Sequence, residues 1–244
     1  MMEFSKNNIL ESLDRAIDTL VKNKKQTILG IGLSVSLVCA GIGYTMYRQN
    51  MQVKAHTTLV SALKVFEAPV VAGSSNKSDV KMPTQFATEE EKWNKVQEIF
   101  KDAYNNHKSA GIAPYFLTYQ AEALAQLGKF DEAIQALSDA IRLMKSTELK
   151  AFYRVKLALI KLDSPKHQQE GLTELKKYAD DQQGLAHECA LYHMGNYYWY
   201  KKDFVQARNY WQQLVIKYGL KDARLQSGFT ELAKSKLRLI SADF

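Results

Sequence analysis

The stretch APYFLTYQAEALAQLGKFDEAIQAL, residues 113–137, decides the fold class of this chain. Its apolar residues recur at steps of three and four, which is the spacing of one face of a helix. The run Gly128-Lys-Phe-Asp-Glu-Ala133 opens a second helix, whose apolar positions continue to Met144. We therefore expect two neighbouring helices, each with one apolar face that must be buried against another element.

The same pattern returns further along the chain. Ala121 and Ala133 of the first pair are matched by Gly195 and Ala207, each 74 residues later, and a weaker copy containing Gly171 lies between them. Small residues at these positions let two antiparallel helices cross closely, and pairs that cannot bury an apolar face alone must stack. The predicted units are residues 114–147, 152–185 and 188–221, followed by a capping helix at about 222–240.

Composition supports an all-α fold and excludes several other classes. The 244 residues include only 12 Gly and 4 Pro, which excludes collagen-like, Pro-rich and turn-dense architectures. The two cysteines exclude a disulfide scaffold or a cysteine-built zinc module. The net charge is +7, but the basic residues do not form a nucleic-acid-binding stripe. We therefore expect no nucleic-acid partner.

An uncharged stretch near the N-terminus predicts a membrane anchor. Thr27–Tyr47 contains no charged residue, and as a helix it would extend about 31 Å, close to the thickness of a bilayer core. Lys25 precedes the stretch and Arg48 follows it, while Tyr44 lies near its far end, where interfacial aromatics are favoured. We interpret residues 27–47 as one transmembrane helix in contact with the lipid bilayer.

Three other interpretations of this stretch fit less well. A cleaved signal peptide has an apolar core of about 7–15 residues, which is shorter than this stretch. A lipoprotein needs a small residue immediately before its lipidated cysteine, whereas Val38 precedes Cys39. A buried core helix is disfavoured by the length of the stretch and by its basic flanks.

Orientation follows from the basic residues at the two ends of the predicted anchor. Four Lys or Arg residues lie before the stretch within about 15 positions and two lie after it, which places the N-terminus in the cytoplasm. In a Gram-negative bacterium the C-terminal part would then be periplasmic. Gly32, Ser36 and Ala40 recur every four residues, either as a surface for packing against another helix or as ordinary membrane-helix composition.

The remaining segments complete the expected domain organisation. Residues 1–26 form a cytoplasmic amphipathic segment that lies on the membrane surface or docks on a partner. Residues 48–67 continue the helix beyond the membrane, and residues 68–87 have the Pro-, Gly- and Ser-rich composition of a flexible linker. Thr88 followed by three Glu residues is a helix start, so the folded domain is expected to span 88–244.

The paired-helix pattern resembles the tetratricopeptide repeat over about 130 residues, and the middle unit departs most from that pattern. The resemblance implies that the first helix of each unit lines a groove that takes an extended peptide or a partner helix, unless the domain's own helices fill it. The implied groove residues are Tyr115, Thr118, Glu122, Tyr153, Lys156, Tyr192, Asn196 and Trp199. Thr118, Glu122 and Tyr192 stand where a clamp for terminal carboxylates would need Lys and Asn, so such a clamp is not expected.

The whole layout resembles a narrower family. A short cytoplasmic segment, one membrane helix and a degenerate repeat domain occur together with residues 113–137 and the run LKAFYRVKLALIKLD, residues 149–163. This layout is similar to the YfgM-type ancillary subunit of the bacterial Sec translocon. The resemblance implies an inner-membrane protein that contacts Sec translocon subunits, exported chains and periplasmic chaperones. The alternative is a repeat scaffold for another envelope machine, such as division, cell-wall synthesis or secretion.

No set of residues predicts catalysis or a cofactor. His187 and His193 are six positions apart, so their rings would diverge by roughly 240° around a helix instead of sharing a metal ion. The glycines form neither a phosphate-binding loop nor a dinucleotide fingerprint. Cys189 has no basic neighbourhood that would activate a thiol. We therefore expect a non-enzymatic protein without metal or cofactor.

Overall fold

The computed structural model describes residues 24–71, 85–219 and 227–242, with side chains described from Ser36 to Ile240 within these ranges. Over these residues the fold is helical, and the single non-helical pairing is an isolated bridge between Val70 and Phe86. The expectation of an all-α fold is confirmed for this part of the chain. The chain divides into two compact units, Met1–Lys54 and Ala55–Phe244.

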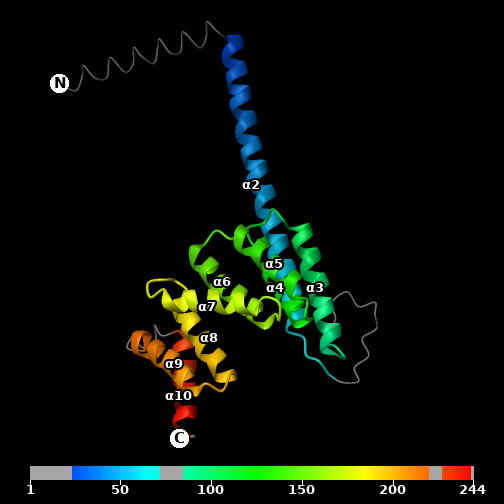
Figure 1. Ribbon diagram of the computed structural model, residues 1–244. Helices are drawn as coiled ribbons and strands as arrows, with labels where there is room; N and C mark the ends of the chain where they lie inside the picture. Colours follow the sequence, from blue (N-terminus) through cyan, green and yellow to red (C-terminus); the bar gives the residue numbers. More distant parts are fainter. Residues whose placement is uncertain (1–23, 72–84, 220–226, 243–244) are drawn as a thin grey trace, which may run out of the picture. The chain divides into compact units, whose positions relative to one another are not determined.

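Helices follow one another along the described chain (Figure 1). They are α2 (Lys24–Phe66), α3 (Glu89–Asn106), α4 (Ala113–Gln126), α5 (Phe130–Leu143), α6 (Thr147–Asp163), α7 (Gln168–Asp180), α8 (His187–Tyr200), α9 (Phe204–Tyr218) and α10 (Gly228–Ala242).

The predicted anchor lies within α2, which is one uninterrupted helix. Of the small-residue stripe, Ser36 and Ala40 are exposed, whereas Gly32 lies outside the residues whose side chains are described. No helix in the described part of the chain combines the length and the hydropathy that a membrane crossing requires. The predicted amphipathic segment lies almost wholly in residues 1–23, outside the described residues. The membrane crossing and the small-residue contact stay predictions.

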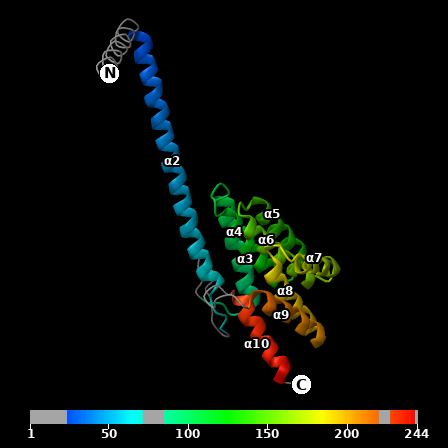
Figure 2. The ribbon, with the colours of Figure 1, turned by 90° about the vertical axis from the view of Figure 1, so that its left-hand side faces the viewer.

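In the second unit, the helices form antiparallel pairs that contact one another in chain order from α3 to α10 (Figure 1 and Figure 2). The pairs α4–α5, α6–α7 and α8–α9 correspond to the three predicted units, and α10 follows them. The middle pair begins at Thr147, five residues before the expected 152. Its start is set by Ser146, whose Oγ accepts a hydrogen bond from the amide of Leu149 at 3.1 Å.

The second unit begins earlier than the expected residue 88. Ala55, Ala62 and Val65 at the end of α2 are fully buried together with Phe100 of α3 and Phe116 of α4. The apolar stripe of α2 therefore continues into a core, because α3 and α4 lie against it. The end of α2 and α3 thus form an additional helical pair before the first predicted unit.

The expected linker contributes to this additional pair at both of its ends. Phe86 is only 1% exposed, and its amide donates a hydrogen bond to the carbonyl oxygen of Pro69 at 3.0 Å. The amide of Val71 donates in turn to the carbonyl oxygen of Phe86 at 2.8 Å. Residues 72–84 of the predicted linker lie outside the described residues. The helix start predicted at Thr88 is present, since Thr88 Oγ1 accepts from the Glu91 amide.

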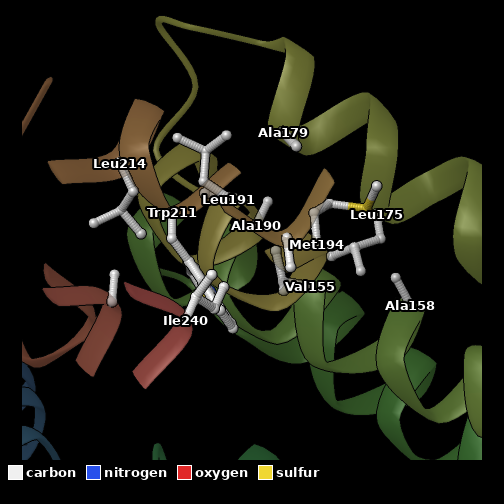
Figure 3. Close-up of a cluster of buried hydrophobic side chains, with 14 residues drawn as sticks. Val155, Ala158, Leu175, Ala179, Ala190, Leu191, Met194, Trp211, Leu214 and Ile240 are labelled. Carbon is white, nitrogen blue, oxygen red and sulfur yellow. The ribbon is translucent and has the colours of Figure 1, made fainter. Parts of the chain in front are cut away.

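Glycines set the closest helix crossings. A Cβ added to Gly195 of α8 would lie 2.2 Å from Nε1 of Trp211 on α9, a side chain that is fully buried. A Cβ added to Gly171 of α7 would lie 2.5 Å from the backbone nitrogen of Leu162 on α6. Figure 3 shows the core beside these crossings, where α6 to α10 each contribute buried side chains. The small residues of the repeat therefore act as predicted, by permitting close approach.

The tight turns inside two of the pairs share one backbone conformation. Gly128 between α4 and α5 has φ of 72°, and Lys202 between α8 and α9 has φ of 61°. The two positions are 74 residues apart, the same offset as in the sequence repeat. Glycine adopts this left-handed conformation freely, whereas a side chain at Cβ makes it costly. The third unit therefore keeps the turn of the first with a less suitable residue.

Candidate functional site

The groove positions predicted on α4 and α6 are held mainly by contacts within the domain. Thr118 is 1% exposed, and its hydroxyl donates to the carbonyl oxygen of Tyr115 at 2.8 Å. Glu122 of α4 forms an ion pair with Lys156 of α6 at 2.5 Å, and Tyr153 packs against the core around α4 and α5. Thr118 is therefore closed to a ligand, and the Glu122–Lys156 pair links neighbouring first helices.

Two aromatic positions predicted on α8 are covered by α10. The ring of Tyr192 lies 5.5 Å from the ring of Phe229, and Lys236 Nζ lies 5.6 Å from the centre of the Trp199 ring. Trp199 also contacts the buried ring of Trp211 at 5.9 Å. The domain's own helix thus occupies the groove at these two residues, which is the second of the two alternatives expected from the sequence.

Hydrogen bonds fix the start of α10 against α8. The carboxylate of Glu188 accepts from the hydroxyl of Thr230 at 2.8 Å and also from the hydroxyl of Ser227. Thr230 is fully buried, so this contact is shielded from water. A charge-assisted hydrogen bond in such a place is stronger than a neutral one. We infer that α10 is a fixed part of the fold and a stable cover for Tyr192.

The groove remains open between α6 and α8, where a cavity of about 550 Å³ lies beside Asn196. Of the eight predicted groove residues, Asn196 is the one that lines it. The lining consists of Leu159, Leu162, Asp163, Gln168, His193, Asn196, Tyr197, Tyr200 and Lys201. The volume falls within the range of pockets that hold small ligands or large side chains.

Asp163 was missed from the sequence, although a signal was present. It is the twelfth residue of the predicted middle unit, the position that the implied groove residue Trp199 holds in the third unit. The sequence pattern gives His193 no place in the groove, and Tyr200 follows the last predicted groove residue of its unit by one position. The cavity therefore lies at the end of the first helices, beyond the middle of the predicted groove.

The titratable groups of the cavity have shifted pKa values. Burial lowers the pKa of His193 to about 4, because the charged imidazolium loses hydration there. Burial also raises the pKa of Asp163. Lys201 places its Nζ 5.8 Å from the centre of the Tyr197 ring. The cavity thus contains a neutral imidazole together with the acidic Asp163 and the basic Lys201.

The structure also places Cys189 and His187, the cysteine and the second histidine of this region. Burial raises the pKa of the Cys189 thiol to about 12, so the thiol stays protonated and unreactive. His187 is buried, and its Nδ1 lies 2.8 Å from the hydroxyl oxygen of Tyr218, away from the cavity that His193 lines. Among the described residues, no group of three His, Cys, Asp or Glu side chains is arranged to hold a metal ion.

Comparison with models of known protein families gives no match, and comparisons with curated proteins and with solved structures give none either.

Proposed function

We propose that this chain is a membrane-anchored, non-enzymatic interaction protein, and that it serves as an ancillary subunit of the bacterial Sec translocon. In this role α2 holds the protein in the inner membrane with its N-terminus in the cytoplasm. The helical pairs then contact exported chains and periplasmic chaperones. The proposal draws on the resemblance in layout and on the physical properties of α2 and of the cavity.

The observation that carries the proposal is the change in environment along the single helix α2. Leu37, Val38 and Met46 are apolar and 60–66% exposed, whereas Ala55 and Ala62 further along are fully buried in the second unit. Exposed apolar side chains over several turns are unfavourable in water and favourable in lipid. One helix thus supplies an apolar surface for a bilayer and a framework for a folded domain.

The cavity between α6 and α8 supports the interaction role over a catalytic one. Among the described residues no hydrogen bond joins His193 to Asp163, as a general base and its orienting partner would require. Two leucines beside aromatic and polar side chains are a composition that suits contact with another polypeptide.

Photocrosslinking in cells tests this proposal. A photoreactive phenylalanine analogue is placed at Ser36 of α2 and at Tyr200, which is 82% exposed beside the cavity. Ile216 of α9 is a matched control, since it is 73% exposed and does not line the cavity. Tyr192 is a poorer position for the probe because Phe229 contacts it.

We expect channel subunits to be captured from Ser36, and exported chains or chaperones from Tyr200 but not from Ile216. Capture of division or cell-wall components from both positions, without any channel protein, would contradict the translocon role. That result would favour the alternative of a scaffold for another envelope machine. Extraction of the chain from membranes by alkaline carbonate would contradict the membrane anchor itself.

A further inference from the structure

The cavity between α6 and α8 has an apolar wall that is not filled by the protein. Leu159 and Leu162 of α6 are partly buried and line one side, and the ring of His193 lines the other. Because His193 is neutral at ordinary pH, its ring behaves as a weakly polar surface. A wall of this kind gains free energy when an aliphatic or aromatic side chain displaces water from it.

The edge of the cavity carries a carboxylate without a partner. Asp163 is exposed, and among the described residues no hydrogen bond or ion pair reaches its carboxylate, whose pKa is raised by loss of hydration. Lys201 also lines the cavity but lies over the ring of Tyr197. A carboxylate at a protein surface attracts a cation more strongly than one in bulk water, because the effective dielectric constant is lower there. The carboxylate of Asp163 therefore complements a Lys or Arg side chain placed beside it, on the part of the lining away from the ring contact of Lys201.

Asn196 adds a neutral polar group beside the same wall. Its side-chain amide is half-buried and has no hydrogen-bond partner among the described residues. An amide side chain both donates and accepts hydrogen bonds, which matches the N–H and C=O of an extended peptide. Tyr200, at 82% exposure, extends the apolar surface outward. These groups together suit a short segment of polypeptide better than a compact small molecule.

We infer that this cavity binds an extended polypeptide segment that inserts an apolar side chain against Leu159 and Leu162 and places a neighbouring Lys or Arg side chain beside Asp163. This inference rests on the proposed interaction function and names the class of segment that the groove selects. Segments with apolar residues next to acidic ones are disfavoured, because a second carboxylate would lie beside Asp163.

Fluorescence anisotropy with the full-length chain in detergent micelles tests the selection. The first probe is a fluorescein-labelled twelve-residue peptide, blocked at both ends, with a central Leu-Arg-Phe-Arg in a Gly-Ser background. The second probe has Gln in place of both Arg residues, and the third has Ser in place of Leu and Phe. The protein variants are Asp163→Asn and the control Asp102→Asn, which removes an exposed carboxylate on α3.

We expect the first peptide to bind at least tenfold more tightly than either of the other two. Asp163→Asn should weaken the first peptide about tenfold and change the second by less than twofold, whereas Asp102→Asn should change neither. Circular dichroism of each variant establishes that the fold is intact. Equal binding of the first peptide to wild type and to Asp163→Asn would overturn the inference, as would equal binding of all three peptides.

Other occupants give different results and also overturn the inference. If a second copy of the chain fills the cavity, sedimentation will show a dimer that Asp163→Asn dissociates, and the peptides will not bind to wild type. Failure of the peptide selection is distinguishable from failure of the proposed function. If Tyr200 still captures exported chains in cells while the peptides show no selectivity, the interaction role stands and this assignment of its ligand does not.

Discussion

Substituting Gly195 with Ala tests the closest helix crossing in the protein. The added Cβ would lie 2.2 Å from Trp211 Nε1 and 2.5 Å from Cδ1, whereas ordinary contact begins at 3.4 Å. The ring would have to move by about 1.2 Å, the difference between 3.4 and 2.2 Å, although its side chain is fully buried. That displacement would also break the hydrogen bond from Trp211 Nε1 to the carbonyl oxygen of Tyr192 at 3.2 Å.

The expected loss of stability follows from three terms. Overpacking of a core costs about 1–3 kcal/mol, and a buried indole N–H left without an acceptor costs about 1–3 kcal/mol. Replacing Gly by Ala inside a helix returns about 1 kcal/mol. We therefore expect Gly195→Ala to lower the free energy of unfolding by roughly 3 kcal/mol, which lowers the melting temperature by about 6–12 °C.

Urea unfolding of the full-length chain in detergent, followed by circular dichroism, measures this loss. Gly228→Ala is the matched control, because nothing lies within 4 Å of its added Cβ, and it should change stability by less than about 0.5 kcal/mol. Combining Gly195→Ala with Trp211→Leu should cost less than the sum of the two single changes, since the smaller side chain makes room for the methyl group. A stable Gly195→Ala variant, or strict additivity, would refute the close crossing.

Three further predictions concern other parts of the second unit. Gly171→Ala should lower the free energy of unfolding by about 2–4 kcal/mol in the same assay. The reason is that the added Cβ would lie 2.6 Å from the carbonyl oxygen of Ala158, and a backbone atom cannot rotate away as a side chain can. A Gly171→Ala variant as stable as the wild type would show that α6 and α7 lie further apart. Lys202→Gly should raise the free energy of unfolding and Gly128→Ala should lower it, each by about 1 kcal/mol, since both positions have positive φ. Equal effects in the same direction would exclude this explanation. The folded pKa of His193, about 4, lies below its unfolded value of 6.5. The contribution of His193 to stability is therefore complete above pH 6.5 and is lost as the pH falls to 4, by at most about 3 kcal/mol. His193→Phe should make the free energy of unfolding depend less on pH over that range, and an unchanged slope would assign the pH dependence to other groups.

Sequence reasoning located the helical pairs but misjudged where the second unit begins. The stripe formed by Leu59, Leu63 and Phe66 indicated a continuing helix without indicating what covers it. In the structure the ring of Phe66 contacts Trp93 at 5.5 Å and Tyr119 at 5.2 Å, from two different helices. A contact between segments that far apart in the chain leaves no periodic signal, so the sequence predicts residues 48–67 as a juxtamembrane helix separate from the folded domain.

The candidate groove likewise combines positions that the sequence indicates with contacts that only the structure shows. Position within the repeat directs attention to the first helices, and Asn196 is the predicted groove residue that lines the open cavity. The repeat pattern does not indicate that other side chains cover Tyr192 and Trp199. The covering side chains are Phe229 and Lys236, which belong to α10. Which groove positions stay accessible depends on how the final helix packs, and that packing is a tertiary property.

The sequence by itself determined the elements: the uncharged stretch of α2, the 3.6-residue periodicity of each helix and the small residues repeated every 74 positions, because these depend on local spacing. The tertiary structure alone decided that α2 supplies core residues from Ala55 onward and that α10 closes one part of the groove. It also decided that Asp163 and His193, thirty residues apart, line one cavity. The physical reason is that periodicity states which face of a helix must be buried, whereas only packing decides what buries it.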